Sequence, residues 1–405
     1  MGPLTFDKSG NLYGTTDAGG ISTCSGGCGT VFELSPNGDG TWSNTILYSF
    51  CTSVFGNQCL DGAHPQARVI FDTAGNLYGT TVNGGGQDCS FDSRGCGTVF
   101  ELSPPTVPGG GWTETVLHAF CADEMNNLCL DGGAPVSELT FDGLGNIYGT
   151  TTVGGTGPTG AGTVFELSPD LGGWTESVLY TFCGAGGYPV CPDGDKPLAG
   201  ITFDKAGNLY GTTWLGGSEK GQGGGTVYQL SPSANGWTET VLYRFLSPFR
   251  AGGGPSANVS IGKRGTLYTT VSSGCRKQNG GIFRFTPANG KGQSFCFNGL
   301  DGNDPIAGVR VDANSETLYG TTFAGGSAQG GTVFKIVAPA QESVLYNFCS
   351  QQKCADGAGP SGLIFDGSGN LYSTAEIGGA HNFGVVFEII QQAPTGKQHA
   401  SQRTH

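Results

Sequence analysis

Short hydrophobic runs alternate with glycine-rich and polar segments along the chain, and they recur in groups of four. The clearest group has runs at 67–72, 77–81, 97–102 and 112–120, with a turn at 73–76 between the first two. The runs are rich in β-branched and aromatic residues and are bounded by turn-forming residues, which is typical of β-strands, and no segment keeps a helical period. Each group therefore predicts four short antiparallel strands, which we call a, b, c and d.

The second run of each group carries the motif Gly-Asn-Leu-Tyr-Gly-Thr-Thr or a variant of it. Its copies are marked by Tyr13, Tyr78, Tyr148, Tyr210, Tyr268, Tyr319 and Tyr372. Seven repeats of four antiparallel strands predict an all-β fold, a seven-bladed β-propeller. Packing of each blade between two neighbours explains why Val69, Ile70 and Phe71 are all apolar instead of alternating. A β-helix is the main alternative, but its coils are much shorter than a unit of about 50 residues.

All seven units are expected to form one domain. The propeller should span residues 1–390, with units starting near 3, 65, 135, 197, 255, 305 and 360, and the polar segment 391–405 should be disordered. Strand d, with its Val-Leu-Tyr-x-Phe motif, is found in only six units. We therefore expect the last blade to be incomplete, with strand c at 384–390 as an open edge. Since nothing before Met1 supplies the missing strand, we expect the natural chain to start further upstream.

Local chemistry accounts for the turns between strands a and b. Their pattern is Asp-x-x-Gly-Asn, in which the carboxylate accepts turn N–H groups and glycine supplies a positive φ. It starts at Asp7, Asp72, Asp142, Asp204 and Asp366. The pattern lacks the several spaced oxygen ligands of a calcium site, so we expect no metal here. Four tryptophans open strand d and are expected to pack at the outer rim, namely Trp42, Trp112, Trp174 and Trp237.

Composition and charge limit the classes of function. Charged residues make up only 13 % of the chain, and the formal net charge is −13 with a pI near 4.7. Binding to nucleic acid needs clustered Lys and Arg, so nucleic acid is not expected as a partner. No apolar run approaches the ~18 residues of a membrane span, and no signal peptide precedes the first unit. We expect a monomer without a cofactor.

Fourteen cysteines favour an oxidising compartment, and hence an extracellular or cell-surface location. Those that follow strand d are Cys51, Cys59, Cys121, Cys129, Cys183, Cys191, Cys349 and Cys354; those in b–c loops are Cys24, Cys28, Cys89 and Cys96; the remaining pair is Cys275 and Cys296. Both kinds of loop leave a blade at the same end, so the cysteines should share one face. Local pairing is the simplest scheme, and each bridge would stabilise by about 2–3 kcal/mol in the loop-entropy model. Zinc is the alternative for Cys24 and Cys28, but no second Cys or His pair accompanies them locally in the sequence.

The same face carries an Asp-Gly turn before most copies of strand a. These aspartates are Asp61, Asp131, Asp193, Asp301 and Asp356. A ring of carboxylates near the axis would bind a cation or polarise a sugar hydroxyl, which makes them candidate ligand-binding residues. The alternative is a turn whose carboxylate bonds to local backbone. Repetition in so many units favours this structural interpretation, because a binding site is normally built once.

Residues that break the repeat are the other candidates for ligand contacts. Trp214, in the b–c loop of unit four, is the only Trp outside the strand-d position. Unit five is the most divergent, and its basic residues, which include Arg276 and Lys277, would suit an anionic glycan or a protein partner. A degenerate blade with a solvated surface explains the same residues. No Gly-x-Ser-x-Gly nucleophile motif is present, so we assign no catalytic residue.

Taken together, the motifs resemble the bacterial tandem-repeat family called GloVer. The matching pattern combines Leu-x-Phe-Asp-x-x-Gly-Asn-Leu-Tyr-Gly-Thr-Thr, a Gly-Gly loop, Gly-Thr-Val-Phe-Glu-Leu-Ser-Pro and Val-Leu-Tyr-x-Phe, and it covers nearly the whole chain. The resemblance implies a propeller-like, exported or surface protein with no assigned activity and no catalytic residues to transfer. The chain departs from the family in having no recognisable anchor.

These observations favour a secreted or cell-surface binding module that contacts a carbohydrate or a surface protein on its disulfide-bearing face. One alternative is a polysaccharide hydrolase or lyase that uses carboxylates of the Asp-Gly turns. Another is a purely structural surface module. Two carboxyls converging in a deep cleft, one with a raised pKa, would favour the enzyme. An exposed Trp214 on a shallow face would favour binding, and a face without a pocket would favour the structural module.

Overall fold

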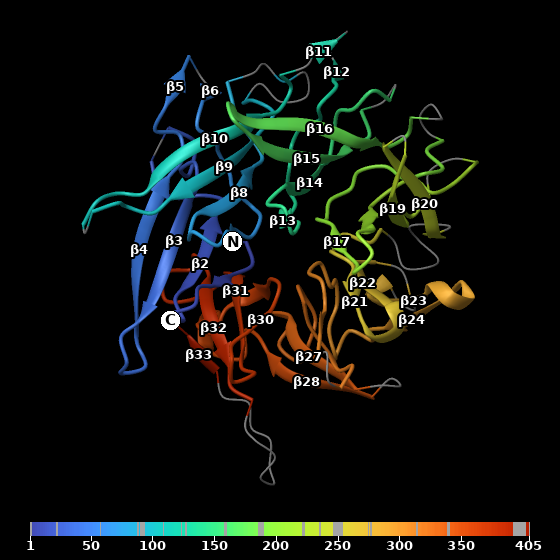
Figure 1. Ribbon diagram of the computed structural model, residues 1–405. Helices are drawn as coiled ribbons and strands as arrows, with labels where there is room; N and C mark the ends of the chain where they lie inside the picture. Colours follow the sequence, from blue (N-terminus) through green and yellow to red (C-terminus); the bar gives the residue numbers. More distant parts are fainter. Residues whose placement is uncertain are drawn as a thin grey trace.

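Seven antiparallel β-sheets surround a common axis in the computed structural model of the protein (Figure 1). The structure describes residues 2–21, 23–56, 58–86, 89, 94–107, 109–122, 124–125, 128–157, 160–184, 190–220, 223–234, 236–245, 254–273, 275, 278–312, 315–337, 341–391 and 402–404. Strand a of each sheet lies nearest the axis and strand d lies at the rim. The prediction of an all-β, seven-bladed propeller with four-stranded antiparallel blades is confirmed.

The blades follow one another around the ring in sequence order. Blade 1 contains β1 (Thr5–Phe6), β2 (Leu12–Thr16), β3 (Thr30–Pro36) and β4 (Trp42–Ser49); blade 2 contains β7 (Ile70–Phe71), β8 (Leu77–Thr81), β9 (Thr98–Ser103) and β10 (Thr113–Ala119). Blade 3 contains β13 (Thr140–Phe141), β14 (Ile147–Thr151), β15 (Thr163–Asp170) and β16 (Gly173–Thr181); blade 4 contains β17 (Thr202–Phe203), β18 (Leu209–Thr213), β19 (Thr226–Ser233) and β20 (Gly236–Arg244). Blade 5 contains β21 (Ser260–Ile261), β22 (Leu267–Val271), β23 (Gly281–Thr286) and β24 (Lys291–Cys296); blade 6 contains β25 (Arg310–Val311), β26 (Leu318–Thr322), β27 (Thr332–Val337) and β28 (Gln341–Asn347). Blade 7 contains β29 (Ala358–Pro360), β30 (Ile364–Phe365), β31 (Leu371–Ile377), β32 (Val385–Ile389) and β33 (Gln402–Thr404).

Short hairpins and 3₁₀ turns lie in the connections between the strands. Two short hairpins follow blades 1 and 2, formed by β5 (Val54–Phe55) with β6 (Gln58–Cys59) and by β11 (Glu124–Met125) with β12 (Leu128–Cys129). Single 3₁₀ turns span Lys263–Gly265, Pro287–Asn289 and Gln352–Cys354.

The last blade is complete, contrary to the expectation from the sequence. Its outer strand is β33, which pairs antiparallel with β32 through Phe387↔Thr404 and Ile389↔Gln402. The free N–H and C=O groups of a strand edge pair with any extended backbone, so this strand does not need the Val-Leu-Tyr-x-Phe motif. The expectation of an incomplete blade with an open edge is wrong for this reason. Most of the tail that was expected to be disordered, 392–401 and 405, lies outside the described residues.

The first threonine of the Gly-Thr-Thr motif joins each blade to the next one. In blade 1 the Thr15 hydroxyl donates to the Ala67 carbonyl, just before strand a of blade 2, at 2.9 Å. The same bond recurs around the ring as Thr80 to Ser137, Thr150 to Ala199, Thr212 to Ala257, Thr270 to Ala307, Thr321 to Ser361 and Thr374 to Gly2. The repeated threonine is therefore an inter-blade contact, and its last copy closes the ring.

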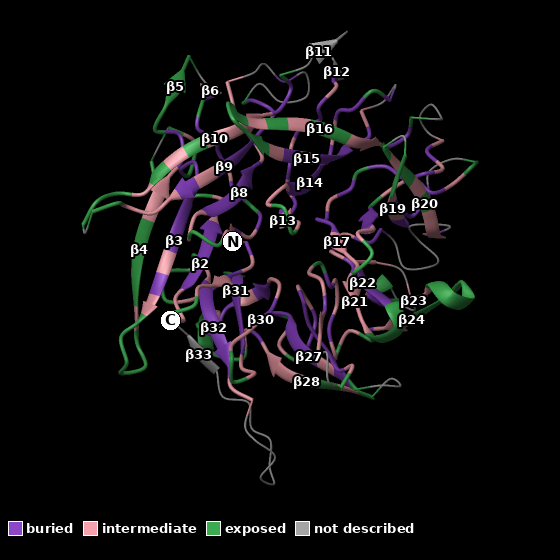
Figure 2. Ribbon diagram, viewed as in Figure 1, coloured by how far each residue is buried: buried purple, intermediate pink, exposed green. Residues whose placement is uncertain are grey.

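Aromatic contacts fill the same interfaces between blades. Tyr13 of blade 1 meets the ring of Phe71 edge-on at 4.9 Å between centroids, and it contacts Trp112 of blade 2 at 6.5 Å. Tyr372 of blade 7 makes the corresponding contact with Trp42 of blade 1. The strand-d tryptophans thus pack against the neighbouring blade, half-buried near the rim, while strands b and c are almost fully buried (Figure 2).

Close packing also explains the glycine of the Gly-Thr-Thr motif. A Cβ atom at Gly79 in β8 would lie 2.6 Å from the ring of Phe100 in β9. The Phe100 side chain is fully buried and packs on Phe50 of the preceding blade. Glycine is required here because the aromatic ring occupies the space of a side chain.

Candidate functional site

The two ends of the blades form two faces with different chemistry. The b–c loops and the connections from strand d to the next strand a leave one end, which we call the loop face. The a–b and c–d turns form the opposite end, which we call the hairpin face. The cysteines and the Asp-Gly turns lie on the loop face, as the antiparallel strand order requires.

Disulfides fix the loops of the loop face. The pairs are Cys24–Cys28, Cys51–Cys59, Cys89–Cys96, Cys121–Cys129, Cys183–Cys191, Cys275–Cys296 and Cys349–Cys354. Six of them join cysteines of a single loop, as the spacing predicts. Cys275–Cys296 is the remaining pair and joins the b–c loop of blade 5 to the end of its strand d. No described cysteine is free.

Two of these disulfides lie against each other between blades 1 and 2. The sulfur atoms of Cys24, Cys28, Cys51 and Cys59 are all within 4.8 Å of one another. No second cysteine pair lies near Cys24 and Cys28 in the sequence, but the fold supplies one by bringing together two loops that are separate along the chain. Zinc binds thiolates, and sulfur atoms paired in disulfides are not thiolates.

The Asp-Gly carboxylates bond within their own connections. Asp61 is 3 % exposed and accepts hydrogen bonds from the backbone N–H and the hydroxyl of Thr52 and from the Tyr48 hydroxyl. The other members of the set accept bonds from nearby residues in the same way, namely Asp131 from Cys121, Asp193 from Cys183, Asp301 from Asn298 and Asp356 from Ser350. These contacts agree with the turn interpretation, and they occupy carboxylate oxygens that a ligand would need.

Strand-d glutamates lie near several of these aspartates. Burial, together with the negative charge of Asp61, raises the pKa of Glu114 to about 8. Burial and the aspartate at the start of the same blade likewise raise the pKa of Glu239 to about 7 and that of Glu342 to about 8. A carboxyl of raised pKa near a second carboxyl is one criterion for the enzyme. Because the arrangement recurs from blade to blade, it belongs to the repeat and does not mark a single reaction centre.

Trp214 lies on the loop face directly after β18 and is 39 % exposed. Its backbone N–H donates to the Lys196 carbonyl, and its indole lies against the backbone of Gly254, where a Cβ atom would come within 2.1 Å of the ring. One side of the indole is therefore packed while the rest is accessible. The two other candidates from this face, Arg276 and Lys277, lie outside the described residues.

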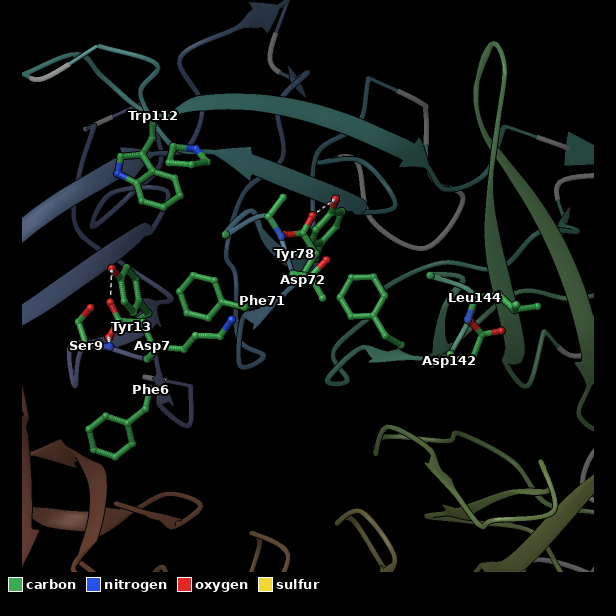
Figure 3. Close-up of a pocket in the computed structure, with 18 of the residues that line it drawn as sticks. Phe6, Asp7, Ser9, Tyr13, Phe71, Asp72, Tyr78, Trp112, Asp142 and Leu144 are labelled. Atoms are coloured by element: carbon green, nitrogen blue, oxygen red, sulfur yellow. Dashed lines mark hydrogen bonds between the residues drawn. The ribbon is translucent and has the colours of Figure 1, made fainter. Parts of the chain in front are cut away.

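The hairpin face carries a groove of about 1070 Å³ across blades 1, 2 and 3 (Figure 3). It lies among the three a–b turns that start at Asp7, Asp72 and Asp142. Seven aromatic residues line it: Phe6, Phe71 and Phe141 from the ends of strand a, Tyr13 and Tyr78 from strand b, Trp112 from just before β10 and Trp174 from the start of β16.

Each turn beside the groove holds its own carboxylate in place. The Asp7 carboxylate accepts backbone N–H bonds from Ser9 and Asn11 at 2.8 Å, the Asn11 side-chain amide at 2.9 Å, and the Tyr13 hydroxyl at 3.4 Å. These bonds are the ones expected of a hairpin turn. The groove therefore offers a ligand its aromatic rings, the exposed side chain of Leu144 and the ammonium group of Lys8.

The sequence did not reveal the groove, because every aromatic residue in it also has a structural role. Trp112 was interpreted as packing only, and it does pack on Tyr13, but it also lines the groove. The available signal was the pairing of a phenylalanine that ends strand a with a tryptophan that begins strand d, and the tryptophan is confined to the first four units.

Fold and site together define a disulfide-bearing β-propeller repeat protein. Residues 1–260 and 254–402 match the family described as the Gloeobacter/Verrucomicrobia repeat, and the chain therefore belongs to that family. No curated protein matches the sequence. Within the described part of the chain, no helix is long and apolar enough to cross a membrane.

Several solved structures have a similar fold. A "putative 6-phosphogluconolactonase" from Bacteroides uniformis is 12 % identical with a TM-score of 0.55, and the match covers 100 % of this chain and 97 % of that one. A second protein so described, from Bacteroides fragilis, is 14 % identical with a TM-score of 0.54, covering 98 % and 94 %. Puromycin hydrolase is 12 % identical with a TM-score of 0.54, covering 96 % of this chain and 52 % of that one. At these identities the similarity shows the fold alone, because propellers carry many unrelated functions.

Proposed function

We propose that this protein is an extracellular or cell-surface binding module that holds a carbohydrate in the hairpin-face groove. The observation that carries the proposal is the series of partly exposed rings of Phe6, Phe71 and Phe141, one from each of three consecutive blades. Aromatic rings bury a large flat apolar area on contact, and the C–H face of a sugar ring is a matching surface. One ring in each blade suits a ligand made of repeating units.

Polar groups at the edge of the groove supply the contacts that orient a sugar. Lys8 and Ser9 are exposed in the a–b turn of blade 1 and lie beside the aromatic lining. An apolar, aromatic lining with a few polar groups is the usual composition of a ligand site. Lys8 would donate to sugar hydroxyls while the rings pack against the apolar face.

The disulfides support the proposed location. Stable disulfides form in oxidising environments such as the cell exterior, and here they fix the loops of most blades. The protein would act there as a monomer.

The loop face is the second candidate surface, for a glycan or a surface protein. Trp214 supports it, since this residue is 39 % exposed and is the only Trp away from the strand-d position of the repeat. The carboxylates of Asp61 and its counterparts add less support, because they are bonded within their own connections. The same bonds weaken the hydrolase or lyase alternative, which depends on those carboxylates.

The test is a glycan-array and polysaccharide-degradation screen on the oxidised protein, followed by matched variants. Lys8→Ala alters the groove, and Lys205→Ala alters the same position of the blade 4 turn, which does not line the groove. Leu144→Asp and Leu171→Asp form a second matched pair of exposed leucines on the hairpin face, of which only Leu144 lines the groove.

Both groove variants should weaken binding by about tenfold, or 1.4 kcal/mol, while the two controls stay within about twofold. Equal effects of variant and control would show that the groove is not the site. Loss of binding in Trp214→Ala alone would place the ligand on the loop face. Depolymerisation of a polysaccharide by the wild-type protein would favour the enzyme.

A further inference from the structure

A second cavity, of about 870 Å³, runs along the propeller axis and is lined by residues of all seven blades. Most of its lining is apolar or small, because the innermost strands present Gly, Ala, Ser and Thr to the axis. Its charged and amide side chains come from positions where the repeats differ. We call this cavity the axial channel.

Three polar side chains of the axial channel come from equivalent positions of different blades. Arg68, Glu138 and Asn258 each lie two residues before the first paired residue of strand a, which is Ile70, Thr140 or Ser260. The other blades have Pro3, Gly200, Gly308 and Gly362 at this position. The set of charged and amide side chains therefore occurs once in the ring, unlike the recurring Asp-Gly turns.

These side chains meet inside the channel. The Arg68 guanidinium donates through Nη2 to Oε2 of Glu138 at 2.8 Å, and the Asn258 amide donates to the same oxygen at 3.1 Å. The ion pair is largely shielded, since the Arg68 and Glu138 side chains are 21 % and 18 % exposed. Residues 120 positions apart in the chain thus converge on one carboxylate oxygen.

A second guanidinium enters the channel from blade 6. Arg310 donates through Nε to the Leu363 carbonyl at 2.7 Å, which fixes the plane of its guanidinium group. Burial lowers the pKa of Arg310, and the positive charge of Arg68 lowers it further while Glu138 opposes the effect. Arginine still keeps its charge at neutral pH, so the channel contains two cations and one anion.

This local charge is opposite in sign to that of the whole protein. Arg68, Arg310 and Glu138 are the ionisable residues among those that line the axial channel, which gives +1 inside a chain of net charge −13. The Arg68 Nε group is buried without a protein hydrogen-bond partner, and so is the Ser256 hydroxyl, which lines the same channel from blade 5. A buried guanidinium with unused donors is stabilised by an anion that bonds to it.

We propose that the axial channel binds a small oxyanion, a carboxylate or a phosphate group, between the guanidinium groups of Arg68 and Arg310. The guanidinium fork matches two oxygens of such a group, and the cavity volume falls within the range of about 300–1,000 Å³ for small-molecule sites. Glu138 holds Arg68 in place in the free protein and competes with the ligand for it. This site is separate from the carbohydrate groove on the hairpin face.

Calorimetric titration of the whole protein at low salt tests the proposal with three probes. D-glucuronate and inorganic phosphate carry the two oxyanions, and D-glucose is the neutral control for glucuronate. We expect at least one anion to bind and glucose not to bind at the same concentration. Binding of glucuronate alone identifies a carboxylate ligand, and binding of phosphate alone identifies a phosphate ligand. No binding of either anion at about 10 mM, far above the Kd of a specific small-ligand site, would overturn the proposal.

Variants locate the bound anion. Arg310→Met and Arg68→Met should each weaken anion binding by about tenfold or more, while Lys291→Met, which removes an exposed cation of blade 5, should leave it unchanged. Glu138→Gln should tighten binding several-fold, because the competing charge is removed while the side chain keeps its shape. The melting temperature shows whether an arginine variant folds. If it does not fold, Glu138→Gln is the deciding variant. Unchanged or weaker anion binding by Glu138→Gln would then contradict the proposed site.

The groove variant Lys8→Ala separates this proposal from the proposed function. It should weaken carbohydrate binding without changing the anion titration, since Lys8 lines the groove and not the axial channel. If Lys8→Ala abolished anion binding, the anion would be bound on the hairpin face and the channel assignment would be wrong.

Discussion

The hydroxyl of Thr374 donates a 3.3 Å hydrogen bond to the carbonyl of Gly2 and so joins the last blade of the propeller to the first. The two residues are 372 positions apart, yet their contact is the same one that every other blade makes with its neighbour within about 50 residues of chain. The ring is therefore closed by the same hydrogen bond that joins the other blades, made here between the last blade and the first.

Thr374→Val should destabilise the ring at this closure. The substitution keeps the shape of the side chain but leaves the Gly2 carbonyl without its donor, which costs about 1–2 kcal/mol. Urea unfolding followed by tryptophan fluorescence measures the change. Thr45→Val, at an exposed position of β4, is the control and should shift the midpoint little. An unchanged midpoint in Thr374→Val would show that the hydroxyl does not contribute to closure.

Deleting residues 392–405 should open the edge of blade 7. The deletion removes β33 and leaves the outer side of β32 unpaired, and such an edge promotes association between chains. We expect a lower melting temperature together with dimers or larger species in light scattering. A monomer with an unchanged melting temperature would mean that β33 adds nothing to the blade in solution.

Stability should fall as pH rises from about 4.5 through about 8. Burial raises the pKa of Glu114 from 4.5 to about 8, and Glu239 and Glu342 shift in the same direction. The folded state holds these protons more tightly than the unfolded state, so their contribution is fully present below pH 4.5 and is lost as pH rises through about 8. The urea midpoint should therefore be higher at pH 5.5 than at pH 9.

Substitution of one glutamate tests this assignment. Glu114→Gln removes one titrating group while keeping the shape of the side chain, so the difference between the two pH values should shrink. Glu219→Gln, at an exposed position, should preserve the wild-type difference. If Glu114→Gln and Glu219→Gln have identical pH profiles, another group is responsible for the pH dependence.

The disulfides should differ in how much they stabilise the fold. In the loop-entropy model, removal of Cys275–Cys296, whose cysteines are 21 residues apart, should cost about 3 kcal/mol, and removal of Cys24–Cys28, 4 residues apart, about 2 kcal/mol. Paired Cys→Ala variants and urea unfolding measure both values. Non-reducing peptide mapping of the wild-type protein comes first, and abundant free thiol or bound zinc would contradict the disulfide pairing itself.

Local patterns in the sequence predict the features that repeat. The Asp-x-x-Gly-Asn turns, the strand runs and the spacing of Cys51 from Cys59 are local patterns whose physical causes act over a few residues. Seven copies of such a unit predict the propeller, because each unit buries its apolar faces only against neighbouring units. The number of blades, the strand order and the grouping of the cysteines on one face follow from that pattern.

Features that depend on contacts between distant residues could not be predicted from these local patterns. The pairing of β33 with β32 is made by backbone groups, so no sequence motif predicts it. The convergence of Arg68, Glu138 and Asn258 on one oxygen requires three blades to be placed around a common axis. Each of these side chains is, in its own unit, an unremarkable polar residue before a short strand. They bond to one another because the closed ring places their positions around one axis.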